Sequence, residues 1–459
     1  MADENQEVIV NGVHVCTEDK NYVPVQNEKV LQHIKEFMGY KLGFMMHWSP
    51  GSQLSTFESW GLIDEQADWS QQEVNWTDDM SEYQKQYIDS YKTFNPIRFR
   101  PDRWAKIAKA CGFKYLLFTT KHHDGFCMFD TKTTDYKITN KDCPFSSNKN
   151  ADIVGSLYEE FKKQGLAIST YFSKPDWHSE YFWADGFPKC KVPNVNYDVK
   201  EYPELWEKYV QYVHAQLREL TSNYGKIDVL WLDGGGVRPE NMGQDIRLSE
   251  IIGEIRDTTQ PDLIVCNRAN GGEFENILTP EASIPKEIIY SPWESCIPIG
   301  EHFSFHYLDR YKTPFELVTM LIEIVAKGGN LALNVPAQPD GELPEGAIRS
   351  IAGLGEWLKI NGEGIYNTYA CPEMPMSSTT YFTKKDNCYY MFYIYSAGVI
   401  RLPKYMLLPN MPKLKSVTLI RNGQNVPFIQ SGESVKLFFD DIDVLFAKHS
   451  DCFKFEFLN

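Results

Sequence analysis

The chain has 459 residues, with 46 Lys and Arg against 62 Asp and Glu, which gives a formal net charge of −16. This length exceeds what one compact core holds, so we expect a large domain followed by a smaller one. The acidic balance argues against nucleic acid and anionic membranes as partners, because both attract basic surfaces. The ten cysteines include no C-x-x-C pair, so we expect no zinc site, redox motif or disulfide framework.

The ends and the hydropathy of the chain give two further expectations. No stretch approaches 18 continuous apolar residues, so we expect no membrane span. The first eight residues, MADENQEV, are polar and acidic and lack the features of a signal peptide. A leader removed from a longer precursor is compatible with this start, so the sequence leaves the compartment open.

Strand and helix patterns alternate through the first three quarters of the chain. An amphipathic segment at 27–42 is followed by short apolar runs that end in polar or aromatic residues. The predicted strands are 42–49, 114–125, 166–173, 227–236, 262–268, 287–294 and 329–335, and the predicted helices are 102–112, 152–165, 204–225, 247–258 and 314–329. Runs that are apolar on both faces suit strands enclosed by helices outside and side chains inside. The pattern predicts a (β/α)8 TIM-type barrel over residues 1–365.

The alternative to the barrel is a doubly wound open sheet. Such a sheet usually has a glycine-rich phosphate turn after its first strand, and MMHWSPG is not one. After about residue 365 the pattern changes to short alternating strands with Asn-Gly and Ser-Gly turns. We therefore predict a C-terminal antiparallel β-sandwich over residues 366–459.

Catalytic groups of barrel enzymes gather at the carboxyl ends of the strands. The predicted strand ends carry His47, Trp48, His122, His123, Asp124, Tyr171, Asp233, Arg268, Trp293 and Glu294, and the loop before Trp293 adds Glu281. Asp233 ends an apolar run and is followed by three glycines that leave room for a ligand. We predict that Asp233 is a nucleophile, and the alternative is a helix-capping aspartate.

Two enzyme classes fit these residues. A metal-dependent hydrolase would use His47, His122, His123 and Asp233 as ligands. Adjacent side chains on a strand point to opposite faces, so we expect only one of His122 and His123 to face inward, which weakens the metal hypothesis. A glycoside hydrolase needs two carboxylates that flank the bond, together with donors and aromatic faces that hold the sugar.

Each residue also has an ordinary structural interpretation. His47 would be a core histidine, and Arg268 would be half of an internal ion pair. Glu281 would belong to the first turn of a helix after Pro280. Trp48 and Trp293 would be packing residues, and Glu294 would brace a neighbouring arginine or histidine.

Eight motifs in order carry a resemblance to a known family. They are GFMMHWSP, YLLFTTKHHDGFCMFDTKTTDYKI, STYFS, DVLWLDGG, VCNR, TPE, PWESC and KGGNLALNVPAQPDG. Together they resemble the α-L-fucosidases of glycoside hydrolase family 29 over residues 25–365. The resemblance implies a barrel followed by a β-sandwich and a retaining exo-glycosidase without a metal or other cofactor. It also implies that the partner is a fucosylated oligosaccharide or glycoconjugate with terminal α-L-fucose.

The resemblance also assigns roles to single residues. Asp233 matches the family nucleophile, Glu281 is the first candidate for the general acid/base, and Glu294 is the second. The implied substrate-binding residues are His47, Trp48, Glu58, Trp60, His122, His123, Tyr171, Arg268 and Trp293. The family often has an aromatic-Gly-Tyr sequence after WESC, whereas this chain reads GEHFSFHY. His302, Phe303, Phe305 and His306 are therefore expected at an altered leaving-group site, and PWESC is similar to the branch that favours α-1,3/1,4-linked fucose. The alternative is a barrel that binds carbohydrate without turnover.

Overall fold

The computed structural model describes residues 22–63, 70, 77–188, 192–268, 270–396 and 399–458, together with the backbone of a short hairpin, β1 (Val8–Val10) and β2 (Val13–Val15). Most of the MADENQEV segment, where we predict no signal peptide, lies outside these residues. Within the described part of the chain, no helix is both long enough and apolar enough to cross a bilayer.

A curled parallel sheet forms the centre of the molecule. Its strands are β3 (Leu42–Met46), β4 (Tyr115–Lys121), β5 (Ala167–Ser173), β6 (Val229–Asp233), β7 (Ile264–Cys266), β8 (Glu294–Pro298) and β9 (Asn330–Asn334). They lie in the order β7-β6-β5-β4-β3-β9-β8. Segment 276–282 lies between the two outer strands: the Asn276 amide donates to the Val265 carbonyl (2.9 Å), and the Glu294 amide donates to the Leu278 carbonyl (2.8 Å). The sheet is therefore a barrel, as the sequence predicts.

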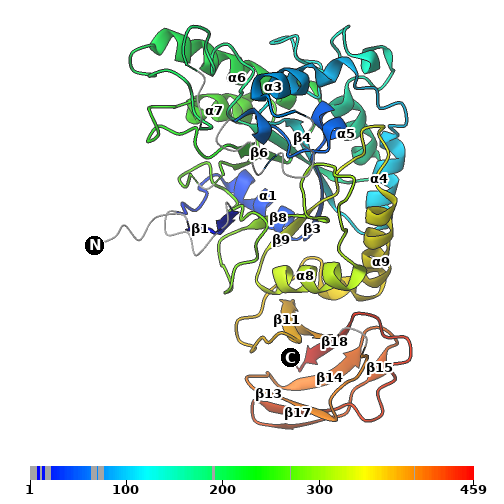
Figure 1. Cartoon of the computed structure of the whole chain (residues 1–459). Coiled ribbons are helices and arrows are strands. Elements are labelled where there is room, and N and C mark those ends of the chain that lie inside the picture. Colours follow the sequence, from blue (N-terminus) through cyan, green and yellow to red (C-terminus); the bar gives the residue numbers. More distant parts are fainter. Residues whose placement is uncertain are drawn as a thin grey trace.

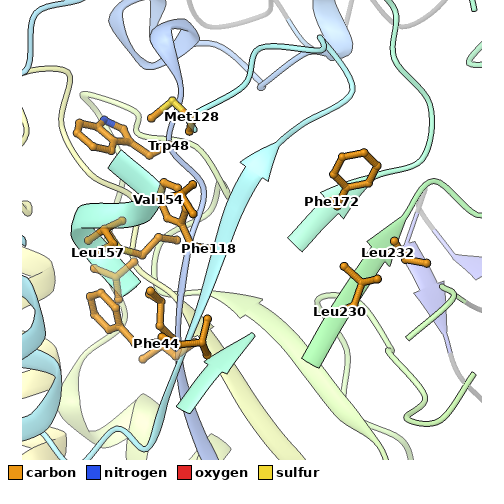
Figure 2. Packing of buried hydrophobic residues seen from close by; sticks show 14 of the residues in the cluster. Phe44, Trp48, Phe118, Met128, Val154, Leu157, Phe172, Leu230 and Leu232 are labelled. Atoms are coloured by element: carbon orange, nitrogen blue, oxygen red, sulfur yellow. The ribbon is translucent and has the colours of Figure 1, made fainter. Parts of the chain in front are cut away.

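Helices surround the barrel because the strands are apolar on both faces. The helices are α1 (Glu28–Met38), α3 (Met80–Asp89), α4 (Pro101–Ala110), α5 (Ile153–Lys163), α6 (Pro203–Asn223), α7 (Leu248–Thr258), α8 (Pro314–Ala326) and α9 (Glu345–Asn361). The sequence patterns did not predict α3 and α9. Figure 2 shows Phe44 and Phe118 of the sheet beside Val154 and Leu157 of α5.

The alternation of side chains along β6 decides where Asp233 points. Leu230 and Leu232 belong to the outer core between sheet and helices, whereas Val229 and Trp231 belong to the core inside the barrel. Asp233 is two residues beyond Trp231, so its side chain points to the same, inner face of the strand. Side chains of α1 pack into the same interior core, so α1 closes the amino ends of the strands.

One predicted strand is misplaced. The apolar run at 287–294 was expected to be a strand that ends at Glu294, but β8 begins at Glu294. The run contains Pro292, which has no amide hydrogen, and Tyr290, whose side chain is 79% exposed. Trp293 and Glu294 consequently lie at the amino end of a strand and not at its carboxyl end.

Antiparallel strands follow α9 and lie below the barrel in Figure 1. A six-stranded sheet contains β10 (Tyr369–Ala370), β11 (Thr380–Lys385), β12 (Cys388–Ile394), β18 (Ser450–Phe457), β14 (Leu414–Leu419) and β15 (Gln424–Asn425), and a three-stranded sheet contains β13 (Tyr405–Leu408), β17 (Ser434–Phe438) and β16 (Phe428–Ser431). Both sheets contribute to a separate apolar core. The division into domains at residues 365 and 366 stays a prediction.

Candidate active site

A cavity of about 970 Å³ opens at the carboxyl ends of the barrel strands. This is the end at which barrel enzymes place their chemistry. Nine of the predicted site residues line it: His47, Glu58, Trp60, His122, His123, Tyr171, Asp233, Arg268 and Glu281. They come from the ends of five strands and from two loops, so only the closed sheet brings them together.

Asp233 is held by groups from three other segments. The Tyr171 hydroxyl donates a hydrogen bond to Asp233 Oδ2 (2.5 Å). Arg268 Nε forms an ion pair with Asp233 Oδ1 at 3.1 Å, and His123 Nε2 lies 3.7 Å from Oδ2. The Asp233 side chain remains 16% exposed, so its carboxylate is fixed but can still be reached from the cavity.

These neighbours keep Asp233 ionised. Burial alone would raise the pKa of Asp233, but the Arg268 guanidinium, followed by His123 and the Tyr171 hydroxyl, holds this pKa well below its usual range. A carboxylate with these partners is charged throughout the neutral pH range. The alternative interpretation of Asp233 as a helix cap does not fit, because α7 begins at Leu248 and its N-cap is Arg247.

The glycines after Asp233 serve close packing. Gly234 has a φ of +82°, and a Cβ there would lie 2.2 Å from Pro175 Cδ. A Cβ on Gly235 would lie 2.9 Å from the Arg268 carbonyl oxygen. The β6 turn therefore packs against the loops that follow β5 and β7, and all three glycines also line the cavity.

Both histidines of the His122–His123 pair face the cavity, contrary to our expectation that only one would. Strand β4 ends at Lys121, and its register with β5 shifts between Thr119 and Lys121. The alternation of a regular strand therefore does not extend to these residues. Ser59 Oγ lies 2.6 Å from His122 Nδ1, and the His122 ring stacks on Tyr171 with centroids 5.7 Å apart.

His47, His122 and His123 are neutral near pH 7. Burial lowers the pKa of His47 to about 4 and that of His123 to about 4, and it lowers the pKa of His122 well below its usual value. Glu58 behaves in the opposite sense, because burial, followed by the nearby Asp124 charge, raises its pKa to about 8. The cavity thus combines a charged Asp233 with a protonated Glu58.

Arg268 connects the two carboxylates of the predicted catalytic pair. Its guanidinium contacts Glu281 Oε2 through Nη2, donates to the Thr279 carbonyl at 2.7 Å, and pairs with Asp233. Glu281 keeps 29% of its side chain exposed and does not begin a helix, which excludes the first-turn interpretation. Arg268 and Ala282 both have positive φ angles (54° and 46°), so the backbone is strained beside the cavity.

Three predicted residues are not brought to the cavity. Trp48 packs with Phe94, Phe99 and Trp104 in the outer core, where Figure 2 also draws it. Trp293 is fully buried, and its indole donates to the Lys327 carbonyl at 3.3 Å. Glu294 receives a hydrogen bond from the Tyr115 hydroxyl at the amino end of the barrel. We expected Trp48 and Trp293 to bind substrate and Glu294 to be an alternative acid/base, but the structure places all three away from the cavity.

The rim of the cavity contains part of the segment that we expected at the leaving-group site. His302 and Phe303 line the cavity, whereas Phe305 and His306 do not. Residues that sequence analysis missed include Trp177, whose ring lies 5.0 Å from that of His123, and Asn334, which bonds His47. Asn334 ends the last barrel strand, and its position there was the available signal.

Two groups of side chains in the described part of the chain have the composition of a metal site. They are His47, Glu58 and His122, and His122, His123 and Asp233, with the potential ligand atoms of each group within 4.8 Å of one another. In both groups nitrogen or oxygen atoms are already bonded within the protein, to Asn334, Ser59, Tyr171 or Arg268. The arrangement suits hydrogen bonding to a polyol. Activity in the presence of a chelator tests the metal hypothesis.

Comparison with protein families gives a match over most of the chain. The family model described as alpha-L-fucosidase matches residues 10–363. The plasma alpha-L-fucosidase of Rattus norvegicus is 28% identical over 353 residues, which cover 72% of this chain and 69% of that protein. The alpha-L-fucosidase of Dictyostelium discoideum is 25% identical over 310 residues, which cover 65% of this chain and 62% of that protein.

Solved structures extend the similarity to the C-terminal sheets. Alpha-L-fucosidase isoenzyme 1 from Paenibacillus thiaminolyticus has a TM-score of 0.78 and 27% identity, and the match covers 94% of this chain and all of that one. A GH29 alpha-L-fucosidase from Bacteroides thetaiotaomicron, trapped as a covalent intermediate with 2-fluoro-fucosyl fluoride, has a TM-score of 0.75 and 19% identity over 96% of this chain and 99% of that one. At that identity the second structure supports the fold alone.

Proposed function

Because this chain belongs to the α-L-fucosidase family of glycoside hydrolases, we propose that it is a retaining exo-α-L-fucosidase that removes terminal α-linked L-fucose from glycans. The observation that carries the proposal is the ionised Asp233, fixed at the carboxyl end of β6 by Tyr171 and Arg268. A retaining glycosidase needs one carboxylate that is charged, rigid and accessible beside the anomeric carbon.

In the proposed first step, an oxygen of Asp233 attacks the anomeric carbon while the bond to the leaving-group oxygen breaks. The product is a fucosyl ester of Asp233, and water opens this ester in the second step. The low pKa of Asp233 favours the second step in particular, because the carboxylate of a stronger acid is a better leaving group. Arg268 and the Tyr171 hydroxyl stabilise the charge that returns to Asp233.

Glu281 is the proposed general acid/base. It must protonate the leaving oxygen, which lies outside the sugar pocket, and Glu281 is partly exposed at the cavity wall. In the structure its carboxylate contacts Arg268, so the acid role requires this contact to open when substrate binds. Glu301 also lines the cavity and is exposed, which makes it the matched carboxylate for comparison.

The remaining cavity residues are proposed to bind fucose. A neutral imidazole has one donor and one acceptor nitrogen, and Nδ1 of His47 and of His122 is already bonded within the protein, which leaves Nε2 for the sugar. Protonated Glu58 offers a donor, and Trp60 and Trp177 offer apolar faces.

We further propose a preference for α-1,3/1,4 linkages, which rests on the resemblance of PWESC to the branch of the family that favours them. The altered segment after it, with His302 and Phe303 at the cavity, is where we expect the linkage to be read. Release of fucose from H-type, Lewis a and Lewis x oligosaccharides compares these linkages directly, and a preference for the H type contradicts this part.

The nucleophile is tested with Asp233→Ala. This variant is expected to remain folded and to lose more than about 1,000-fold in kcat on an aryl α-L-fucoside, because no covalent intermediate can form. Asp245→Ala is the control, since Asp245 is an exposed aspartate on the same connection between β6 and α7 and lies outside the cavity lining. A near-normal rate in Asp233→Ala, or a 2-fluoro-fucosyl label on another peptide, would contradict the assignment.

The acid/base is tested by comparing Glu281→Ala with Glu301→Ala. Loss of the acid slows substrates with poor leaving groups much more than activated aryl fucosides, because activated leaving groups need little protonation. Added azide is expected to restore turnover of the activated substrate only in Glu281→Ala. Rescue of Glu301→Ala instead would move the role to Glu301.

The same assay separates the two alternative functions. A carbohydrate-binding barrel without turnover predicts fucose binding and no release by the wild type. A metal-dependent hydrolase predicts loss of activity in excess EDTA, and the fucosidase proposal predicts that activity is unchanged. Loss of fucose release that returns on adding a divalent ion would favour the metal groups described above.

A further inference from the structure

We infer that Asn334 is a positioning residue that fixes His47 as a hydrogen-bond acceptor toward the sugar and ties this histidine to the leaving-group rim. The inference rests on the proposed fucosidase function, to which it adds a determinant of how the sugar is bound. Asn334 is the last residue of β9, is fully buried, and lies 287 positions from His47 in the sequence.

The hydrogen bonds of Asn334 determine the orientation of its amide. The His47 backbone N–H lies 3.0 Å from one side-chain atom, and a backbone N–H can only donate, so this atom is Oδ1. The Phe303 carbonyl lies 2.7 Å from the other atom, and a carbonyl can only accept, so this atom is Nδ2. The two contacts are independent and lead to the same orientation.

The amide orientation then determines the tautomer of His47. His47 Nδ1 lies 2.9 Å from the same Oδ1, and two acceptors do not form a hydrogen bond, so Nδ1 carries the proton. Burial keeps the imidazole neutral, which leaves a lone pair on Nε2. His47 lines the cavity, and Nε2 has no protein partner among the residues that the structure describes. Nε2 is therefore set to accept a hydrogen bond from a hydroxyl group.

The second end of Asn334 reaches the rim. Phe303 lies in the segment that follows β8 and lines the cavity, and its ring centroid is 5.1 Å from that of His47. A single amide therefore connects the histidine at the end of β3 to the rim segment. A residue that could accept but not donate would orient His47 and leave the rim carbonyl without its partner.

Asn330 provides a matched control on the same strand. It is also fully buried, and its Nδ2 donates to the Phe37 carbonyl at 2.9 Å, but it begins β9 at the closed end of the barrel. Replacing Asn330 or Asn334 by leucine removes a buried amide of the same size from one strand. Effects on stability are expected in both variants, whereas effects on His47 are expected only in Asn334→Leu.

The tautomer is measured by nitrogen NMR of protein labelled with ¹⁵N-histidine, with His47→Gln to assign the signals. The wild type and Asn330→Leu are expected to show His47 protonated on Nδ1 at pH 7, with a shift of Nε2 when L-fucose is added. Asn334→Leu is expected to lose this preference. A wild-type His47 protonated on Nε2, or the same tautomer in Asn334→Leu, would overturn the inference whether or not the protein releases fucose.

Kinetics on an aryl α-L-fucoside provide the second readout. Asn334→Leu is expected to raise KM about tenfold with kcat within about twofold, because a contact made in both the bound substrate and the transition state is weakened. Asn334→Asp keeps an acceptor for Nδ1, so its KM at pH 8 should stay within about threefold of the wild type. Its negative charge favours the imidazolium, so the ratio of its KM to that of the wild type should rise as pH falls toward 6. The ratio removes the contribution of Glu58, whose pKa is about 8 in both proteins.

These outcomes separate the inference from the function on which it rests. If the wild type releases no fucose, the proposed function fails, and the NMR measurement still decides the link between Asn334 and His47. If the wild type is active and Asn334→Leu has the KM and tautomer of Asn330→Leu, the function stands and the inference fails.

Discussion

At the scale of single residues, environment gives similar side chains different charges. Asp233 and Glu58 line one cavity, yet Arg268 keeps the first ionised and burial keeps the second protonated. Such a separation of pKa values is typical of sites that use carboxyl groups for different tasks. Burial of Glu58 in the cavity therefore lowers the free energy of unfolding at neutral pH, because its carboxyl group is ionised in the unfolded chain and protonated in the folded one.

This loss of stability predicts the behaviour of Glu58→Gln. The pKa of Glu58 is about 8 in the folded protein and near 4.5 when unfolded, so folding stability is lost as pH rises from 4.5 to 8. Removing the carboxyl group should raise the free energy of unfolding by roughly 1–3 kcal/mol at pH 7 and change it little at pH 4. Urea denaturation of both proteins at the two pH values measures the difference, and an equal change at pH 4 and pH 7 would show that ionisation is not its cause.

At the scale of elements, strand β6 and its turn form one unit that aims the nucleophile. The strand fixes the inward direction of Asp233, and the turn fits between Pro175 and the Arg268 carbonyl without side chains. The positive φ of Gly234 is a conformation that other residues adopt with strain.

Gly234→Ala is therefore expected to destabilise the protein by about 1–3 kcal/mol and to lower kcat, because Asp233 moves with the turn. Gly253→Ala is the matched control: Gly253 lies within α7, and a Cβ there would meet no atom within 4 Å. That change is expected to stabilise the protein by up to about 1 kcal/mol through helix propensity. Thermal unfolding and kcat of both variants provide the measurement, and normal activity in Gly234→Ala would show that the turn does not position Asp233.

At the scale of the whole molecule, the barrel and the C-terminal sheets share packed surface. The Trp357 indole of α9 donates to the Ser450 carbonyl of β18 at 2.9 Å, and the Thr383 hydroxyl of β11 donates to the Gly364 carbonyl at 2.7 Å. Trp357, Phe392 and Cys452 belong to the same apolar cluster as the outer core of the barrel. Figure 1 shows α8 lying between the barrel and these sheets.

We expect the two parts to unfold together. Calorimetry of the full chain should give a single cooperative transition, because separating the parts exposes Trp357 and its apolar neighbours to water. Truncation after residue 365 should give a protein that aggregates or melts at a lower temperature. Two separate transitions, or a truncated barrel with unchanged Tm, would show that the C-terminal sheets are independent of the barrel.

Local patterns predicted much of this architecture. The alternation of apolar strands and amphipathic helices predicted the barrel, and the short alternating strands after residue 365 predicted antiparallel sheets. The same patterns failed at 287–294, because a short apolar run with a proline does not distinguish a strand from the connection before it. That error placed Trp293 and Glu294 at the wrong end of β8.

The sequence by itself determined that Asp233 shares one face of its strand with Val229 and Trp231, because side-chain alternation along a strand is a local property of the backbone. Only the tertiary structure decided that this face is the interior of the barrel. Only the tertiary structure decided that His122 and His123 both face the cavity, that Arg268 joins Asp233 to Glu281, and that Asn334 holds His47. These contacts join segments far apart in the chain. They depend on the closure of the sheet and on loop geometry, and no spacing within a single motif contains that information.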